Sequence, residues 1–402
     1  MGKVTEPAGS GPASDKKVHD MPLDTAIPET AAAKIDWPAR AEALAQTIAA
    51  QAAAHDADDS FVADAYAQLK AEGFFKALVP VEFGGGGAEI AEVCQVIRRL
   101  GAACGSTALA FAMHSHLVAV AAWRWRKQGA ATEGLLKRVA AEDLVLVSSG
   151  GSDWLASGGQ AVKVEGGFAI TARKAFSSGC LAGDLLMTSA VFEDPESGPT
   201  VLHFAVPLKA SGVEIVETWR TLGMRGTGSH DVVLTEVFVP EAAISGRRPS
   251  GPWHPLFHII SMIAFALIYS AYLGVADGAR ARALEITRRK SPDPHVAELI
   301  GSMENAFAGA EMAWERMVDT AQTGAPGPDS TNRAMICRTL LAQDAIATVE
   351  RAMEAAGGAS FYRDTGLERA FRDIQGARFH PLQDAPQRRY SGRVALGWDI
   401  DA

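Results

Sequence analysis

The spacing of apolar residues divides the chain into a helical segment, a strand-rich segment and a second helical segment. Residues 36–140 carry apolar side chains three and four positions apart, as in SFVADAYAQLKAEG, which indicates amphipathic helices. Residues 141–250 change to short β-rich runs such as HDVVLTEVFVP, separated by Gly, Asp and Pro. Residues 251–402 return to long helical stretches. The pattern predicts three domains in the order helices, antiparallel sheet (a barrel or sandwich), helices.

Two stretches do not follow this alternation. Residues 1–35 are polar and rich in Pro, Gly, Ser and Ala, without the apolar core of a signal peptide, and we expect a disordered arm. The run 259–276 has 18 residues without a charge, close to the roughly 20 that a membrane span needs. Because it continues unbroken into a charged helical stretch, it predicts a core helix, at the centre of a bundle or at a subunit interface.

Composition narrows the function. With 48% apolar and 21% charged residues the chain is of ordinary globular type, and its net charge of −9 without a basic block argues against a nucleic-acid partner. His114 and His116 lie two apart on a predicted helix, which is a poor spacing for a metal pair, so no metal site is expected. The cysteines lack CxxC spacing and fit a reducing cytoplasm. They are Cys94, Cys104, Cys180 and Cys337.

Three sequence blocks, in order, carry a family resemblance. They are LVPVEFGGGGA, TLGMRGTGSHDVVLTEVFVPE and EAAGGASFYRDTGLERAFRD. Together they resemble the acyl-CoA dehydrogenase superfamily, from about residue 74 to residue 397. The resemblance implies an α+β, mainly helical fold: an N-terminal helical domain, a middle β-domain and a C-terminal four-helix bundle. It also implies a flavin (FAD or FMN) between the sheet and the bundle, and a homotetramer.

The resemblance assigns flavin contacts at two turns. In KAFSSG, Phe176 takes the aromatic position beside the flavin ring, and Ser178 takes the place of a threonine that hydrogen-bonds the N5–O4 edge. VSSGGSD resembles a second flavin-binding block, shortened by two residues; it would direct Ser148 and Ser149 to the polar edge of the ring and Ser152 to the phosphates. The alternative for each serine is a turn cap.

At the other end of the flavin, the family positions correspond to Arg289, Gly357, Gly358 and Ser360. Two neighbouring positions depart from the family: Pro292 replaces an aromatic residue and Glu354 replaces an amide. A carboxylate repels a pyrophosphate unless it is paired, so these departures predict a loosely held adenine end and similar affinities for FMN and FAD.

The catalytic base of the dehydrogenases is missing. They need a carboxylate to remove a proton from the substrate, and the two family positions for it correspond here to Pro381 and Ala264. Asp384 is the remaining acidic candidate. His380, next to Pro381, resembles the histidine of the superfamily's flavin-dependent monooxygenase branch. There it would donate to the oxygen that reduced flavin activates, work that suits a group titrating near pH 7.

Substrate contacts are expected from two places. His114 and His116, in FAMHSHL, point to different faces of their helix, and one of them is expected to face the substrate. Arg225 lies in the loop that closes over substrate in the family, where it either pairs with an anionic group or braces the turn.

Three functions follow from these residues. The first is a two-component monooxygenase that receives reduced flavin from a separate flavin reductase and uses O₂ on a small hydrophobic substrate. The second is an acyl-CoA dehydrogenase with a non-standard base, passing electrons to electron-transfer flavoprotein. The third is a non-catalytic flavin-binding scaffold.

Overall fold

The structure, a computed structural model, describes residues 35–401, except for the side chains at positions 150 and 152. The predicted arm at 1–35 therefore lies outside the described residues, apart from Ile35. The first helical layer begins where Asp36 caps a helix by accepting from the backbone N–H of Ala39. Its helices are α1 (Trp37–Asp58), α2 (Ala63–Ala71), α3 (Ile90–Ala103), α4 (Gly105–Gln128) and α5 (Glu133–Glu142).

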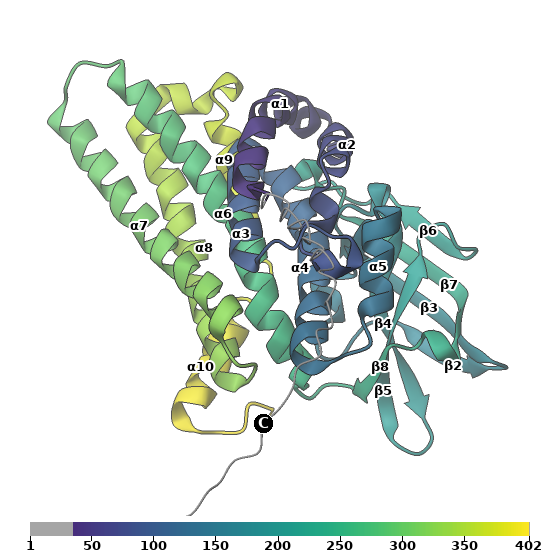
Figure 1. The fold of residues 1–402 in the computed structure, drawn as a ribbon. Helices are drawn as coiled ribbons and strands as arrows, with labels where there is room; N and C mark the ends of the chain where they lie inside the picture. The colour runs from purple at the N-terminus through teal and green to yellow at the C-terminus, as the bar shows by residue number, and fades with distance from the viewer. Residues whose placement is uncertain (1–34, 402) are drawn as a thin grey trace, which may run out of the picture. The chain divides into compact units, whose positions relative to one another are not determined.

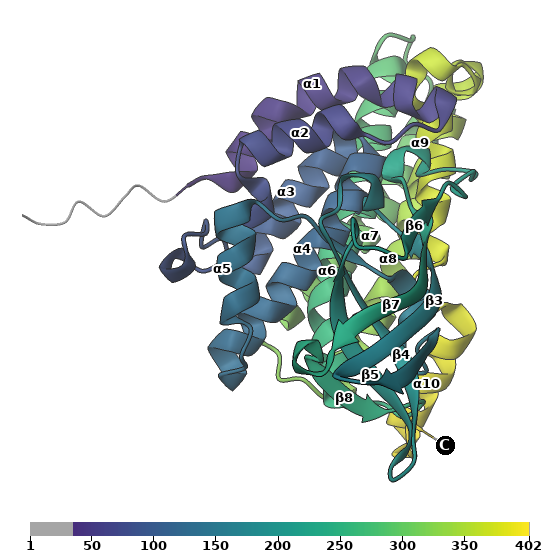
Figure 2. The same cartoon turned by 90° about the vertical axis from the view of Figure 1, so that its right-hand side faces the viewer.

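One mixed sheet follows. Its strands run in the order β6-β7-β3-β2-β4-β5-β8, with β1 added beside β4. Figure 2 shows the sheet from the side on which β7, β3, β4 and β5 face the viewer. Most pairs are antiparallel, as predicted, but β1 and β2 both pair with β4 in parallel. An apolar–polar alternation is the same for either strand direction, so the sequence alone did not show these two pairings. The strands are β1 (Leu146–Ser148), β2 (Gln160–Val164), β3 (Gly167–Ser177), β4 (Leu185–Asp194), β5 (Gly198–Pro207), β6 (Val213–Val216), β7 (His230–Pro240) and β8 (Gly246–Pro249).

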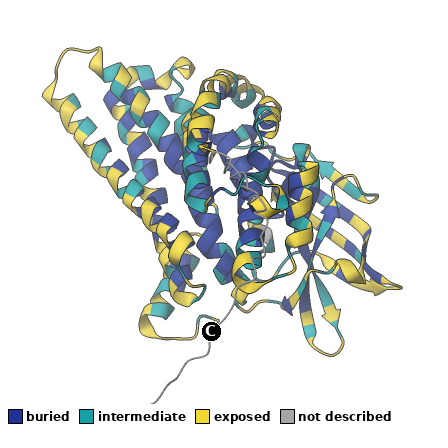
Figure 3. Ribbon diagram, in the orientation of Figure 1, coloured by how far each residue is buried: buried dark blue, intermediate teal, exposed yellow. Residues whose placement is uncertain are grey.

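The second helical part is built around one buried helix. Helix α6 packs against α3 and α4 on one side and against α7, α8 and α9 on the other, and it is dark along most of its length in Figure 3. Figure 1 shows the long helices α6, α7 and α8 side by side, away from the sheet. The helices are α6 (Pro255–Arg288), α7 (Pro294–Thr323), α8 (Pro328–Ala356), α9 (Leu367–Ile374) and α10 (Asp384–Leu396).

Among the described residues, two helices are long and apolar enough to cross a membrane by length and composition alone, α4 and α6. In each, 94% of the most apolar window is buried inside the fold. Helix α6 is apolar all round because helices surround it, which favours the centre of a bundle over a subunit interface for the run 259–276. The predicted fold class and its order of helices, sheet and helices are confirmed.

Candidate functional site

His380 is held from two helices. Its Nε2 lies 2.7 Å from the hydroxyl of Tyr272 on α6. Its backbone carbonyl accepts a hydrogen bond of 3.0 Å from Nη2 of Arg338 on α8, which also donates to the carbonyl of Ala377 at 3.1 Å. Tyr269, one turn before Tyr272, donates to the same Ala377 carbonyl at 2.8 Å. Helices α6 and α8 thus fix both the backbone and the imidazole ring of this segment.

The environment of His380 keeps its imidazole neutral. Burial, with smaller contributions from Arg338 and His116, lowers the pKa of His380 to about 3. The expectation of a group titrating near pH 7 is therefore wrong. The imidazole packs against the rings of Tyr269 and Tyr272, which limits its solvation as a cation, and sequence spacing does not reveal that.

The two histidines of α4 have different surroundings. His114 is buried with both ring nitrogens engaged: Nε2 lies 2.7 Å from the carbonyl of Phe75, and Nδ1 accepts from the N–H of Leu146 at 2.9 Å. This joins α4 to β1 and leaves no ring nitrogen for a substrate, so the structure does not support that role for His114. His116 bonds only through Nδ1, at 3.3 Å to the carbonyl of Ala112, and it is close enough to His380 to affect its titration.

A chain of three buried hydroxyls joins the turn after β3 to the loop before β7. Ser178 Oγ lies 2.8 Å from Ser229 Oγ, which lies 2.7 Å from Thr227 Oγ1. Thr227 Oγ1 donates in turn to the carbonyl of Met224 at 2.9 Å. The turn and the loop before β7 are also joined through their backbones, since the N–H of Gly179 donates to the carbonyl of Thr227 at 2.9 Å.

Phe176 presents an aromatic ring beside this chain. The register of β3 with β7 shifts between Lys174 and Ser177, and in that shift Phe176 adopts a φ of +60°, uncommon for a residue with a side chain. Its ring is 55% exposed and meets the ring of Trp219 edge to face at 5.9 Å. A strained backbone that holds an aromatic ring in the open is typical of a binding position.

A buried ion pair organises the segment after β1. Lys174 Nζ lies 2.6 and 2.8 Å from the two carboxylate oxygens of Asp153 and also donates to the carbonyl of Ser189 at 2.6 Å. Burial lowers the pKa of Lys174, and the Asp153 charge opposes that shift. Asp153 further accepts from Thr188 Oγ1 at 2.9 Å and from the hydroxyl of Ser149. The carboxylate thereby fixes the whole segment onto β3 and β4.

The predicted flavin serines lie at the end of β1 and in the segment that follows it. Ser149 is engaged with Asp153, whereas the buried Ser148 Oγ has no hydrogen-bond partner among the described residues. The side chain of Ser152 lies outside the described residues. An unpaired buried hydroxyl at the end of β1 is a donor that fits the polar edge of a flavin ring.

Close backbone contacts bring these parts together. A Cβ at Gly151 would lie 2.8 Å from Cγ of Pro381, so the segment after β1 touches the residue that follows His380. A Cβ at Gly376 would lie 2.9 Å from the Tyr272 hydroxyl and 3.4 Å from Cγ of Met224. The hydroxyl chain, the segment after β1 and the Tyr272–His380 pair are therefore neighbours in one region.

Arg225 braces its turn. Its Nε donates to the carbonyl of Thr221 at 3.0 Å and lies 3.5 Å from a carboxylate oxygen of Asp59, and its Nη1 donates to the carbonyl of Asp56. The guanidinium therefore contacts the end of α1 and its own loop. Of the two roles left open for Arg225, the geometry supports the brace and not the substrate contact.

The residues expected at the adenine end lie at the ends of α6 and α8. Arg289 is exposed and pairs with Glu285, and Glu354 pairs with Arg351 at 2.6 Å. Gly357 has a φ of +68° and ends α8, and Ser360 Oγ donates to its carbonyl at 2.8 Å. Gly358 follows in the same turn, with open space around it. None of these contacts tests a cofactor role.

The dehydrogenase base positions hold no base in this structure. Ala264 is buried in α6, and Pro381 packs on Gly151. Asp384, the acidic alternative, lies at the first turn of α10 with its carboxylate 3.4 Å from Nη1 of the buried Arg338. The carboxylate is thus paired with a guanidinium of α8.

Sequence reasoning missed several residues of this region. Tyr272 and Arg338 gave no signal because each looks like an ordinary position of an amphipathic or apolar helix. Thr227 and Ser229 looked like turn residues. Asp153 and Lys174 did have a signal, since both lie inside the two quoted flavin blocks, VSSGGSD and KAFSSG.

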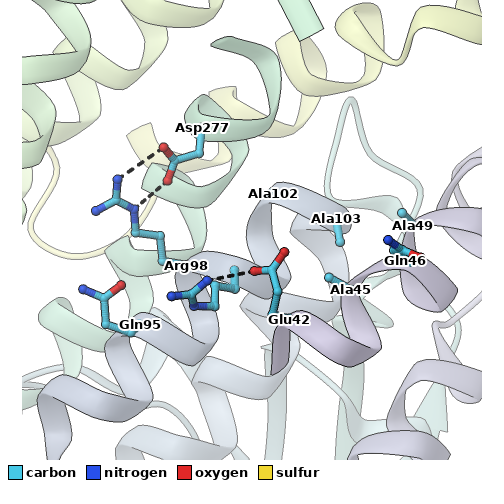
Figure 4. A pocket seen from close by; sticks show the side chains of 10 residues that line it. Glu42, Ala45, Gln46, Ala49, Gln95, Arg98, Ala102, Ala103 and Asp277 are labelled. Atoms are coloured by element: carbon cyan, nitrogen blue, oxygen red, sulfur yellow. Dashed lines mark hydrogen bonds and ion pairs between the residues drawn. The ribbon is translucent and has the colours of Figure 1, made fainter. Parts of the chain in front are cut away.

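A groove elsewhere on the surface is unconnected with these residues. It lies between α1, α3 and α6 and is lined by alanines and by charged pairs, Arg98 with Asp277 and Arg99 with Glu42 (Figure 4). No candidate site residue lines it. Within residues 35–401 as described, no cluster of three or more His, Cys, Asp or Glu side chains is placed to hold a metal ion.

Two sequence profiles match the chain. The profile of the acyl-CoA dehydrogenase N-terminal domain matches residues 39–138, and that of the acyl-CoA dehydrogenase C-terminal domain matches residues 266–384. The chain belongs to the acyl-CoA dehydrogenase superfamily. Together the two profiles cover more than half of the chain, one before and one after the strands in the sequence.

Individual superfamily members resemble this one along nearly the full length. A putative acyl-CoA dehydrogenase of Bacillus subtilis, YdbM, is 26% identical over 87% of this chain and 93% of its own. HsaA of Rhodococcus jostii, the oxygenase subunit of a flavin-dependent monooxygenase, is 26% identical over 81% of this chain and 89% of its own. The crystal structure of KijD3 with FMN and a dTDP-linked amino sugar superimposes with a TM-score of 0.82 at 23% identity, covering 91% of this chain and 94% of that one.

Proposed function

We propose that this superfamily member is the oxygenase component of a two-component flavin monooxygenase. It would bind reduced flavin delivered by a separate reductase, and one oxygen atom of O₂ would enter a small hydrophobic substrate. The other oxygen atom would leave as water, and the two electrons would come from the flavin, which leaves oxidised. Activated oxygen is the chemistry that the flavin supplies.

The observation that carries this proposal is the replacement of a base by a fixed neutral histidine. His380 is held by Tyr272 next to Pro381, while both family base positions lack a carboxylate. A neutral imidazole can donate and accept hydrogen bonds, but with its pKa lowered to about 3 this one is a weak base for removing a proton from a thioester. HsaA is the oxygenase subunit of a flavin-dependent monooxygenase and KijD3 binds FMN, and both similarities support the same function.

The other residues take roles around the flavin. Ser178 would face the N5 edge, Phe176 the ring, and Ser148 with Ser149 the polar edge, while His116 and His380 would face the reacting oxygen and the substrate. We assign Arg289, Gly357, Gly358, Ser360 and Ser152 to the phosphate and adenine end of the cofactor. The cytoplasm as location and a homotetramer as assembly are part of the same proposal.

Exposed apolar side chains support the assembly. Met312, Leu340 and Phe361 on the helical bundle are 64%, 47% and 86% exposed. A second copy would remove such surface from water. Size-exclusion chromatography with light scattering at several concentrations measures the assembly directly.

The test of the function mixes the purified protein with reduced FMN without oxygen and then adds O₂. We expect reduced FMN to bind, and oxygen consumption and flavin reoxidation to change when candidate aromatic and other hydrophobic compounds are present. Anaerobic bleaching of bound oxidised flavin by an acyl-CoA, lost in Asp384→Asn but retained in His380→Ala, would instead establish the dehydrogenase. Flavin binding without either reaction would favour the scaffold.

A further inference from the structure

The three buried hydroxyls near Phe176 form a chain of hydrogen bonds, and the group at one end of this chain can only accept. Ser178, Ser229 and Thr227 are 7%, 3% and 0% exposed, so water does not compete for their hydrogen bonds. The last contact of the chain is the carbonyl of Met224, which only accepts. That carbonyl is fixed in place because it also accepts from Nε1 of Trp219 at 3.0 Å.

Counting protons fixes the direction of every bond. There are three hydroxyl protons and three contacts: Ser178 to Ser229, Ser229 to Thr227, and Thr227 to the Met224 carbonyl. All three contacts are hydrogen bonds only when each hydroxyl donates toward Met224. The proton of Ser178 then points at Ser229, away from any ligand. The free side of Ser178 carries only lone pairs.

We infer that Ser229 and Thr227 are positioning residues that make Ser178 a hydrogen-bond acceptor, so that the site selects reduced over oxidised flavin. This inference rests on the proposed function, which places Ser178 at flavin N5. Reduced flavin has a proton on N5 and donates there. Oxidised flavin has a lone pair on N5 and accepts.

The two redox forms therefore meet the chain differently. Reduced flavin extends it by one more donor, and every contact stays bonded. With oxidised flavin, a lone pair of N5 faces a lone pair of Ser178 Oγ. This repulsion is avoided only if every hydroxyl of the chain donates in the opposite direction, and Thr227 then loses its hydrogen bond to the Met224 carbonyl. A net hydrogen bond contributes about 0.5–1.5 kcal/mol, so we expect the chain to favour reduced flavin by roughly 3- to 10-fold. This preference suits an enzyme that collects reduced flavin from solution.

The experiment measures two dissociation constants for each protein, those of oxidised FMN and of dithionite-reduced FMN under anaerobic conditions. The variants are Thr227→Val, which keeps the shape of the side chain, and Ser229→Ala. Each frees Ser178 to donate. We expect the ratio of the oxidised to the reduced dissociation constant to fall about 3- to 10-fold in both, with no further fall in the double variant because both belong to one chain.

Thr348→Val is the matched control. Thr348 is equally buried, and its hydroxyl donates to the carbonyl of Asp344 at 2.7 Å on α8, outside the chain of hydroxyls. The control should leave the ratio unchanged. An unchanged ratio in both site variants, or an equal weakening of both redox forms, would overturn the inference and leave the monooxygenase proposal standing. Failure of the unaltered protein to bind FMN in either form would overturn both.

Discussion

At the scale of single residues, burial decides the charge of the imidazoles in the site. Burial lowers the pKa of His116 to about 4 and that of His380 to about 3. Burial also raises the pKa of Tyr272, so its hydroxyl keeps its proton. Within the described residues His380 is the one hydrogen-bond partner of that hydroxyl, which therefore donates to Nε2. The remaining imidazole proton is then on Nδ1, ready to be donated.

His380→Ala tests this donor. We expect product formation relative to hydrogen peroxide to fall on the order of 10²-fold, because the activated oxygen loses its hydrogen-bond donor. Tyr272→Phe should give a smaller loss in the same ratio, since it releases the ring without removing it. The measurement is the yield of product and of peroxide per reduced flavin consumed.

The same assignment predicts the pH dependence of that ratio. Since the pKa of His380 is lowered to about 3, its imidazole stays neutral from pH 5 upward and contributes no inflection there. We expect any inflection between pH 5 and 9 to be shared by the unaltered protein and His380→Gln. An inflection near pH 6.5 that disappears in His380→Gln would contradict the neutral imidazole.

At the scale of elements, one ion pair fixes the segment after β1 onto the sheet. Asp153 and Lys174 have side chains that are 7% and 0% exposed, and Arg248 holds the carbonyl of Trp154 at 3.0 Å in the same segment. A buried pair of this kind contributes little over two apolar residues, but the loss of one partner leaves an uncompensated charge. The pair therefore specifies where the segment lies.

Asp153→Asn measures that effect. We expect the free energy of unfolding, from urea titration, to fall by about 3–5 kcal/mol because Lys174 keeps a buried charge. The double variant Asp153→Leu, Lys174→Met should recover part of the loss. Glu142→Gln removes the exposed pair with Arg138 and is the control, for which we expect no measurable change. Equal losses in Asp153→Asn and the double variant would show that shape, not charge, matters here.

The ends of α6 and α8 carry the residues that we assign to the adenine end of a flavin. Glu354 has Arg351 as its partner and Arg289 has Glu285, so each of these charges is already partly balanced before a pyrophosphate binds. We expect FMN and FAD to bind within about tenfold of each other, roughly 1.4 kcal/mol. Glu354→Gln should shift the balance toward FAD. A stronger preference of the unaltered protein for FAD, measured by titration of both flavins, would contradict this.

The order of elements was predictable because periodicity and motif order are local properties of the sequence. The contacts of the site were not. Tyr272 meets His380 across 108 positions, and Ser178 meets Ser229 across 51, with neither pair distinguished by its neighbours. His114 and His116 look equivalent in FAMHSHL. The structure distinguishes them, because His114 is bonded to the carbonyl of Phe75 and to the N–H of Leu146 and is therefore structural, whereas His116 stays a candidate for the site.

At the scale of the described molecule, the last short helix ties the parts together. Arg372 on α9 lies 2.8 Å from a carboxylate oxygen of Asp56 on α1, and it also pairs with Glu368. The next residue, Asp373, accepts from the N–H of Met224, at the end of the hydroxyl chain. The loop that carries Thr227 and Ser229 of the hydroxyl chain is thus anchored by a side chain from the C-terminal part of the protein.

Asp373 makes stability depend on pH in a direction opposite to that of most carboxylates. Its pKa is raised to about 6. Burial is the largest cause, the hydrogen bond from the N–H of Met224 opposes the shift, and the nearby Asp56 adds to it. An acid with a higher pKa in the folded state binds its proton more tightly there. Its contribution favours folding below the unfolded pKa of about 3.9 and is lost as pH rises through about 6.

Asp373→Asn removes this titration while keeping an oxygen that can accept from Met224. Between pH 4.5 and 7.5 we expect the free energy of unfolding of the unaltered protein to fall relative to that of the variant, by about 2 kcal/mol. Urea titrations of both proteins at several pH values give the difference directly, and background titrations shared by the two cancel in it. A difference that stays constant across this range would mean that the carboxyl group is ionised with an ordinary pKa, and that the anchor at Met224 is a charged one at every pH at which the enzyme works.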